Sequence, residues 1–260
     1  MKTFLNTLLA PFNLAIGRRL PGGQLIDHAL QDAFESVYAA VHAFTMLNRQ
    51  RLALLFELAC HFCKVNISGS FVECGVWKGG AAGMMACAAK LNGEIRDLHL
   101  CDIFDDIGEP DWRIDGERAV REAGGKEYAQ GRQQSIKGIY DRKGGPGTIE
   151  ACRELLEKKI NWPSARLHFH QGWFQETLPK VGLAIGPIAL LHIDADWYAS
   201  TKLCLDNIYD RVVSGGAVVI DDYGGYDGCR KAVDEFLGSR GMHPFFNHVD
   251  EECVYWFKEK

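Results

Sequence analysis

The sequence has no long hydrophobic run and no basic cluster, and each absence excludes a class of protein. The apolar stretch at residues 1–16 is too short to cross a bilayer, which takes ~20 apolar residues, and Pro11 and Asn13 interrupt it. No run of lysine and arginine is long enough to bind a nucleic-acid backbone, and the formal net charge is −5. We therefore expect neither a membrane span at this end of the chain nor a nucleic-acid partner.

Regularly paired cysteines are also missing. The nine cysteines are odd in number, irregularly spaced and often inside apolar runs, where a free thiol behaves as a small hydrophobe. This pattern argues against a disulfide framework and for a reducing compartment, so we expect a cytoplasmic protein. Cys60 and Cys63 have C-x-x-C spacing but no second ligand pair nearby. Helix packing is therefore favoured there over a zinc or redox site.

The N-terminal segment lacks the marks of a secretory signal. Only Lys2 precedes its apolar part, Arg18 and Arg19 follow it, and no small-residue cleavage site is evident. We expect it to pack on the domain or on a partner subunit, which favours a homo-oligomer; shallow attachment to a membrane surface is the alternative. The length of 260 residues fits one α/β domain at 66–260 with a helical cap at 1–65.

Helical and strand patterns alternate along the chain. Apolar residues at spacings of three and four predict helices, and short apolar runs that end in acids predict parallel strands buried on both faces. Two apolar runs near the end of the chain, separated by three acidic residues, predict an antiparallel hairpin. The whole predicts a doubly wound, mostly parallel sheet, with a lid or substrate insertion at about 103–147. Helices are expected at 26–43, 48–64, 81–91, 148–159, 200–211 and 229–237, and strands at 71–74, 98–102, 165–170, 187–193, 217–220, 243–249 and 253–257.

A glycine turn follows the first predicted strand and opens a helix, which is the setting of a cofactor loop. Glycines let the backbone approach a ligand closely. The spacing is Glu73-x-Gly75-Val76-x-x-Gly79-Gly80, not the G-x-G-x-x-G of dinucleotide binders. S-adenosylmethionine has no pyrophosphate and needs no tight phosphate cradle, so this turn suits that cofactor. A plain tight turn between strand and helix is the alternative.

Two further strand ends could complete a cofactor site. Asp102 ends the second predicted strand, where an acid can accept hydrogen bonds from both ribose hydroxyls, although a helix cap is an equally common role. Gly172 and Trp173 follow another strand, and the indole could line an adenine pocket; packing is the commoner role of a tryptophan.

Acids at two successive strand ends are the strongest signal in the chain. Asp194 and Asp196 follow one buried strand, and Asp221 and Asp222 follow the next. The carboxyl ends of parallel strands meet at one sheet edge, where ligands bind. Carboxylates gathered there repel unless a cation neutralises them, and their hard oxygens favour Mg²⁺, with Mn²⁺ or Ca²⁺ as substitutes. Solvated strand-end caps are the alternative.

A methyl transfer would follow from such a site. A divalent cation at Asp194, Asp221 and Asp222 lowers the pKa of an acceptor hydroxyl and orients it. Asp194 or Asp196 is the expected base, with His192 and His170 as weaker candidates. A metal-dependent glycosyltransferase, with D-x-D on a nucleotide sugar, is one alternative. A non-catalytic scaffold of the same fold is another.

Four blocks in order resemble the macrocin O-methyltransferase (TylF-like) family: residues 73–80, 172–179, 193–201 and 215–223. The resemblance implies a Rossmann-like class I methyltransferase fold with seven strands, and methylation of a sugar or glycan hydroxyl with S-adenosylmethionine and Mg²⁺. It implies metal ligation by Asp194, Asp221 and Asp222. It also implies cofactor contacts by Thr45, Met46, Glu73, Gly75, Val76, Gly79, Asp102, Gly172, Trp173 and Asp194. Ala199 stands where members usually have glutamate, a departure that concerns the substrate rather than the reaction.

Overall fold

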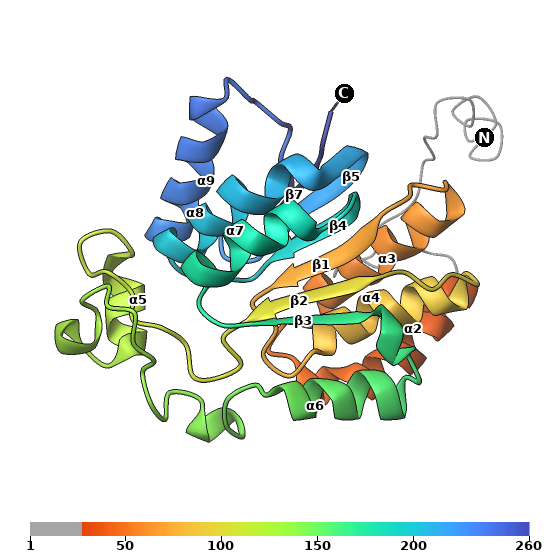
Figure 1. The fold of residues 1–260 in the computed structure, drawn as a ribbon, viewed down its shortest axis with the longest axis horizontal. Helices are drawn as coiled ribbons and strands as arrows, with labels where there is room; N and C mark the ends of the chain where they lie inside the picture. The colour runs from red at the N-terminus through yellow and green to blue at the C-terminus, as the bar shows by residue number, and fades with distance from the viewer. Residues whose placement is uncertain (1–27, 260) are drawn as a thin grey trace.

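The computed structural model describes residues 28–259, and one seven-stranded sheet organises them (Figure 1). The strand order is β3-β2-β1-β4-β5-β7-β6, in which the first five strands are parallel and β7 pairs antiparallel with both β5 and β6. This confirms the predicted doubly wound sheet with an antiparallel end. The strands are β1 Ser70–Cys74, β2 Leu98–Asp102, β3 Leu167–Gln171, β4 Ile188–Ile193, β5 Val212–Ile220, β6 Asn247–His248 and β7 Val254–Phe257.

Helices cover both faces of the sheet (Figure 1). On one face lie α2 His28–Val41, α3 Arg49–Lys64, α4 Gly80–Leu91 and α6 Ile149–Arg153, which a π-helical turn at Glu154–Lys159 continues. On the other face lie α7 Phe174–Ala184, α8 Tyr198–Ile208 and α9 Asp227–Ser239. The predicted apolar segment at 1–16 lies outside the described residues. Between residues 28 and 259, no helix is both long enough and apolar enough to cross a membrane.

Side-chain alternation along the strands divides the core into two clusters. Phe71 of β1 and Leu190 of β4 point into the cluster with α2, α3, α4 and α6. Val72 and Leu191, one residue further along, point into the cluster with α7, α8 and α9. Strand residues buried on both faces read as continuous apolar runs, which is why β4 was recognisable from the sequence. The same alternation decides which polar side chains reach the edge of the sheet.

Two strands differ from the predicted ones by more than three residues at one end. Residues 214–216 were expected to follow a helix, but α8 ends at Ile208 and these residues lie inside β5, which begins at Val212. Gly215 has φ +80°, and the pairing of β4 with β5 shifts register there, so the glycines form a bulge within the strand rather than a turn before it. The predicted strand at 243–249 is also too long, since β6 contains only two residues.

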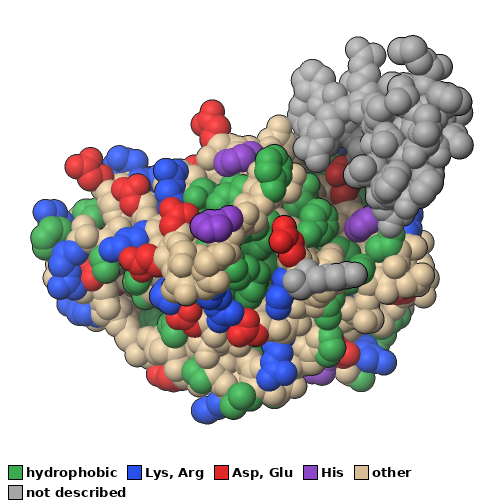
Figure 2. Space-filling model, turned by 90° about the horizontal axis from the view of Figure 1, so that it is seen from above, with side chains coloured by type: hydrophobic (Ala, Val, Ile, Leu, Met, Phe, Trp, Pro, Cys, Tyr) green, Lys and Arg blue, Asp and Glu red, His purple; other side chains and the backbone are tan. Residues whose placement is uncertain are grey.

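The insertion between β2 and β3 lies beside the carboxyl ends of the parallel strands (Figure 1). Its regular structure is the short α5 Gly116–Ala123, two 3₁₀ turns and two isolated bridges, followed by α6. In Figure 2, charged side chains of both signs are dense at the end of the molecule that holds this insertion, while apolar side chains gather nearer the middle of the face shown.

Candidate active site

A cavity of about 930 Å³ opens at the carboxyl edge of the sheet. Its size suits a small organic ligand together with a cofactor. We call the lining residues at the carboxyl ends of β1, β2, β4 and β5 the floor, and the lining residues of the insertion between 105 and 143 the wall. The floor consists of Gly75, Val76, Trp77, Asp102, Asp194, Ala195, Asp196, Asp221 and Asp222.

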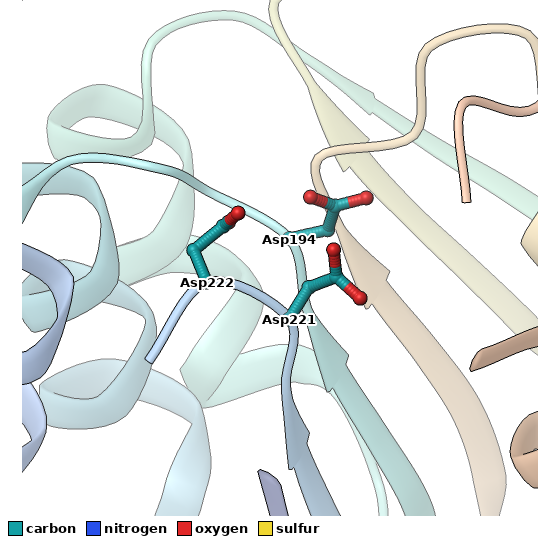
Figure 3. Close-up of side chains that lie close together, drawn as sticks. All are labelled: Asp194, Asp221 and Asp222. Atoms are coloured by element: carbon teal, nitrogen blue, oxygen red, sulfur yellow. The ribbon is translucent and has the colours of Figure 1, made fainter. Parts of the chain in front are cut away.

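Three floor aspartates converge, as predicted. Ile193 of β4 and Ile220 of β5 are register partners, so the residues that follow them leave the sheet side by side. One carboxylate oxygen from each of Asp194, Asp221 and Asp222 lies within 4.8 Å of the others, and the side chains project into a common space (Figure 3). Burial, reinforced by the neighbouring carboxylates, raises the pKa of Asp194 and of Asp222 well above the ordinary value.

These aspartates fit a hard divalent cation. The Oδ1 atom of Asp221 is buried and has no hydrogen-bond partner among the described residues. A buried carboxylate oxygen without a partner is costly, and coordination to Mg²⁺ would satisfy it. An all-carboxylate set of ligands also favours Mg²⁺ or Mn²⁺ over the softer transition metals. The three residues are therefore suited to hold such an ion.

The glycine turn lies directly against the strand that carries the first aspartate. Gly75 has φ +86°, and a Cβ atom on it would lie 1.6 Å from the backbone oxygen of Asp194. The Asp194 amide also donates to the carbonyl of Cys74 at 2.8 Å. Gly79, with φ +85°, begins α4 as its N-cap. Gly75 and Val76 line the cavity, whereas Gly79 is buried behind it and shapes the turn.

Asp102 ends β2 and lines the cavity, where its carboxylate holds the glycine turn. Its Oδ2 accepts hydrogen bonds from the amides of Val76 at 2.5 Å and Trp77 at 3.1 Å, and its Oδ1 accepts one from Phe104 at 2.7 Å. Burial raises the pKa of Asp102, although these amide hydrogen bonds act in the opposite direction. Each carboxylate oxygen can accept more than one hydrogen bond, so a ribose hydroxyl can still bind there.

Glu73 and His192 lie beneath the floor and are not among the lining residues of the cavity, so their predicted contacts with cofactor and substrate stay predictions. The two residues are register partners on β1 and β4, and strand alternation points both side chains toward the α4 face. Glu73 accepts a hydrogen bond from the Ala82 amide at 3.1 Å, and its other oxygen lies 3.2 Å from His192 Nδ1.

His192 acts as a buried partner of carboxylates. Burial alone would lower its pKa, but the adjacent Asp221 and Glu73 raise the pKa of His192 to about 9. Its Nε2 lies 3.9 Å from Asp221 Oδ1, which is beyond hydrogen-bonding distance. With 1% side-chain exposure, the His192 ring contacts Glu73 and Asp221 from beneath the floor and is not exposed to the cavity.

Asp194 and Asp196 both line the cavity, so both keep the predicted position of a base. Asp196 has φ +57°, a left-handed conformation that is strained for a residue with a side chain. Its amide donates to Asp222 Oδ2 at 3.1 Å. Burial, followed by the charge of Asp221, raises the pKa of Asp196 to about 7. A carboxylate with a pKa near neutrality is suited to accept a proton from a hydroxyl.

The other predicted residues divide into those at the cavity and those away from it. Met46, Gly172 and Trp173 line it. Thr45 is not a lining residue; its Oγ1 accepts a hydrogen bond from the Leu47 amide. His170 lies on β3 against His99, with 3.0 Å between ring nitrogens, and has no part in the site.

Sequence reasoning missed several lining residues because only the fold brings them to the cavity. Arg51, in the first turn of α3, reaches Asp221. Two indoles hold the ends of the insertion: Trp197 Nε1 donates to the carbonyl of Gly108 at 2.9 Å, and Trp77 Nε1 donates to that of Gly145 at 3.2 Å. These contacts join segments far apart in the chain, and no local motif marks them.

Comparison with known proteins gives a consistent result. A sequence model described as macrocin-O-methyltransferase (TylF) matches residues 31–138 and 155–258. The chain is 30% identical over 217 residues to demethyldecarbamoylnovobiocin O-methyltransferase of Streptomyces niveus, covering 83% of this chain and 76% of that protein. It is 29% identical over 218 residues to a Streptomyces olivaceus 4'-O-methyltransferase of a rhamnosyl-tetracenomycin, covering 82% and 75%. The solved structure of the O-methyltransferase NovP superposes with a TM-score of 0.70 at 25% identity, covering 90% of this chain and 99% of that one.

Proposed function

The chain belongs to the macrocin-O-methyltransferase (TylF) family and is an O-methyltransferase, and from this premise we propose that it transfers a methyl group from S-adenosylmethionine to a sugar hydroxyl held beside a divalent cation. One observation carries the proposal: three carboxylates within 4.8 Å of one another share a cavity floor with the glycine turn. This arrangement brings a cation site and a cofactor site into one cavity.

The chain's own residues have distinct roles in this reaction. Gly75, Val76 and Asp102 would bind the cofactor from one side of the floor, and Gly172 with Trp173 would enclose its adenine. Asp194, Asp221 and Asp222 would hold Mg²⁺, which supplies electrostatic stabilisation to the oxygen that loses its proton. Asp196, with its raised pKa, would accept that proton. The remaining contribution is alignment of the hydroxyl with the sulfonium methyl group, which is a matter of proximity and orientation.

The acceptor is proposed from the relatives and from the wall of the cavity. The Streptomyces olivaceus relative is named for a rhamnosyl-bearing acceptor, and a third relative, 26% identical over 219 residues, is the mycinamicin III 3''-O-methyltransferase of Micromonospora griseorubida. The wall offers many hydrogen-bonding side chains, among them Glu109, Asp111 and Gln133, which suit a hydroxyl-rich acceptor. We propose that the insertion at 103–147 selects this acceptor. Contacts between copies of the chain and a cytoplasmic location stay predictions.

Transfer of radiolabelled methyl from S-adenosylmethionine to a panel of free and glycosidic sugars tests the proposal. We expect EDTA to abolish the transfer and added Mg²⁺ to restore it. Activity that survives complete chelation would remove the cation from the reaction.

Calorimetry separates this reaction from the glycosyltransferase alternative. S-adenosylhomocysteine is expected to bind and nucleotide sugars to bind weakly or not at all. Tight binding of a nucleotide sugar alone would reject the methyltransferase assignment of this cavity.

A further inference from the structure

Arg51 is a cation built into the edge of the proposed metal site. Its guanidinium has side-chain exposure of 12% and donates to Asp221 Oδ2 at 2.5 Å. It also donates to Asp250 at 2.8 and 3.2 Å and to Glu252 at 2.9 Å. One arginine therefore joins the first turn of α3 to a metal-site aspartate and to the turn between β6 and β7.

The backbone of Arg51 is also fixed relative to Asp250. Asn48 caps α3 by accepting hydrogen bonds from the amides of Gln50 and Arg51, and its side chain donates to Asp250 at 2.7 Å. Asp250 in turn accepts hydrogen bonds from the amides of Glu252 and Cys253. A guanidinium anchored this way has a fixed position beside Asp221, because its forked contacts to several carboxylates restrain it.

The two oxygens of Asp221 are used differently. Oδ2 accepts the hydrogen bond from Arg51, while Oδ1 is buried, accepts no hydrogen bond and lies 3.9 Å from His192 Nε2. A cation could therefore bind through the free oxygen while Arg51 keeps the other one. Asp194 and Asp222 lie close by. The three carboxylates together therefore carry more negative charge than one divalent cation neutralises.

We propose that Arg51 is an internal counter-ion that keeps the three aspartates assembled when no metal is bound, and that it thereby weakens the binding of the metal itself. The inference rests on the proposed metal site. Three carboxylates at this separation repel one another, and a fixed positive charge on one of them offsets part of that repulsion. The same charge repels an incoming divalent cation at short range, so assembly of the empty site is gained at the expense of metal affinity.

The test uses the full chain stripped of metal, with Mn²⁺ binding followed by titration calorimetry and thermal unfolding recorded with and without Mn²⁺. In Arg51→Gln, we expect Mn²⁺ to bind roughly tenfold more tightly than in the unaltered protein. The metal-free variant should unfold at a lower temperature, and Mn²⁺ should raise its midpoint by more than it raises that of the unaltered protein. Arg51→Lys, which keeps the charge, should bind Mn²⁺ within about threefold of the unaltered protein.

A matched control keeps the Arg51 guanidinium and its contacts with Asp221 and Glu252 but weakens its contact with Asp250. Asp250→Asn weakens the tie between α3 and the β6–β7 turn, and we expect it to lower the unfolding midpoint while leaving the gain from Mn²⁺ nearly unchanged. Unchanged or weaker Mn²⁺ binding in Arg51→Gln would overturn the counter-ion role. Failure of the unaltered protein to bind Mn²⁺ would instead reject the proposed metal site.

A second measurement does not depend on the folding of Arg51→Gln. Arginine side-chain NMR signals of the unaltered protein, with Arg51 assigned through Arg51→Lys, should shift when Mg²⁺ is added. A guanidinium signal for Arg51 that does not respond to saturating Mg²⁺ would also overturn the proposal.

Discussion

The floor and the wall of the cavity are built in opposite ways. Floor residues extend directly from buried strands, and Asp221 and Asp222 are themselves buried. Wall residues belong to a segment with one short helix and with exposed ion pairs such as Lys137 with Asp105. A rigid sheet edge suits chemistry that needs fixed geometry, whereas a surface segment tolerates change. The difference agrees with our proposal that the floor carries the reaction and that the wall selects the acceptor.

The largest expected effect is on kcat, and it should differ between an aspartate of the floor and an aspartate of the wall. Asp194→Asn should lower kcat by about 1000-fold or more, because several kcal/mol of electrostatic stabilisation at about 1.4 kcal/mol per tenfold are lost. Asp111→Asn, a substitution of the same shape in the wall, should change kcat by less than about tenfold. Steady-state kinetics with one acceptor measure both, and equal losses would erase the distinction.

Substitution of two glycines with nearly the same φ, one in the floor and one in the insertion, compares how much each region contributes to stability. Gly75→Ala in the floor would place a Cβ atom 1.6 Å from the Asp194 oxygen, so it should lower the free energy of unfolding by about 3 kcal/mol or more. Gly145 in the insertion has φ +84° and no atom within 4 Å of such a Cβ, so Gly145→Ala should cost about 1 kcal/mol from backbone strain alone. Urea unfolding gives both values; similar values would show that the floor relaxes as easily as the insertion.

A third prediction concerns the sheet far from the cavity. Burial, followed by the nearby His168 and His170, lowers the pKa of His99 to about 4. The unfolded chain therefore takes up a proton near pH 6.5 that the folded chain does not take up until about pH 4. The contribution of His99 to stability is complete above pH 6.5 and declines as the pH falls through this window. His99→Asn should lose that part of the pH dependence in unfolding curves between pH 7 and 4, and parallel profiles for both proteins would contradict it.

The smallest effect is expected from the ion pairs of the insertion. Lys137 has a side-chain exposure of 68% and pairs with Asp105, exposed by 40%. Such a pair contributes less than about 1 kcal/mol to folding because water and salt screen it. Thermal unfolding of Lys137→Ala should therefore show a midpoint close to that of the unaltered protein. A fall as large as that of Gly75→Ala would mean that the wall is as rigid as the floor.

The sequence predicted those features that local patterns determine. The acids that follow the buried runs of β4 and β5 predicted the three aspartates that converge at the sheet edge, and the strand at 98–102 was predicted with the bounds that β2 has. The bulge at Gly215 was missed because a glycine pair reads as a turn unless the partner strand is known. Glu73 was assigned to the cofactor because of the resemblance to the family. Only the register of β1 with β4 reveals that it faces His192 instead.

Arg51 shows the limit most clearly. Locally it is one of two basic residues in the first turn of a helix, and its partners Asp221, Asp250 and Glu252 lie 170 to 201 positions away. Charge pairs over such distances leave no periodicity or spacing in a single sequence. The wall was likewise predicted only as an irregular region, since its contacts depend on where the sheet edge lies.

The two indole contacts at the ends of the insertion have a consequence for how acceptors can change. Trp197 fastens the segment at Gly108 and Trp77 fastens it at Gly145, so both attachment points are set by residues that adjoin the strand tips. The chain between Gly108 and Gly145 can therefore change in length or sequence while both hydrogen bonds to the indoles stay in place. Residues 139–154, which the family's sequence model leaves unmatched, overlap the second of them. Grafting a relative's loop between Gly108 and Gly145 is thus a natural route to an enzyme that methylates a different acceptor.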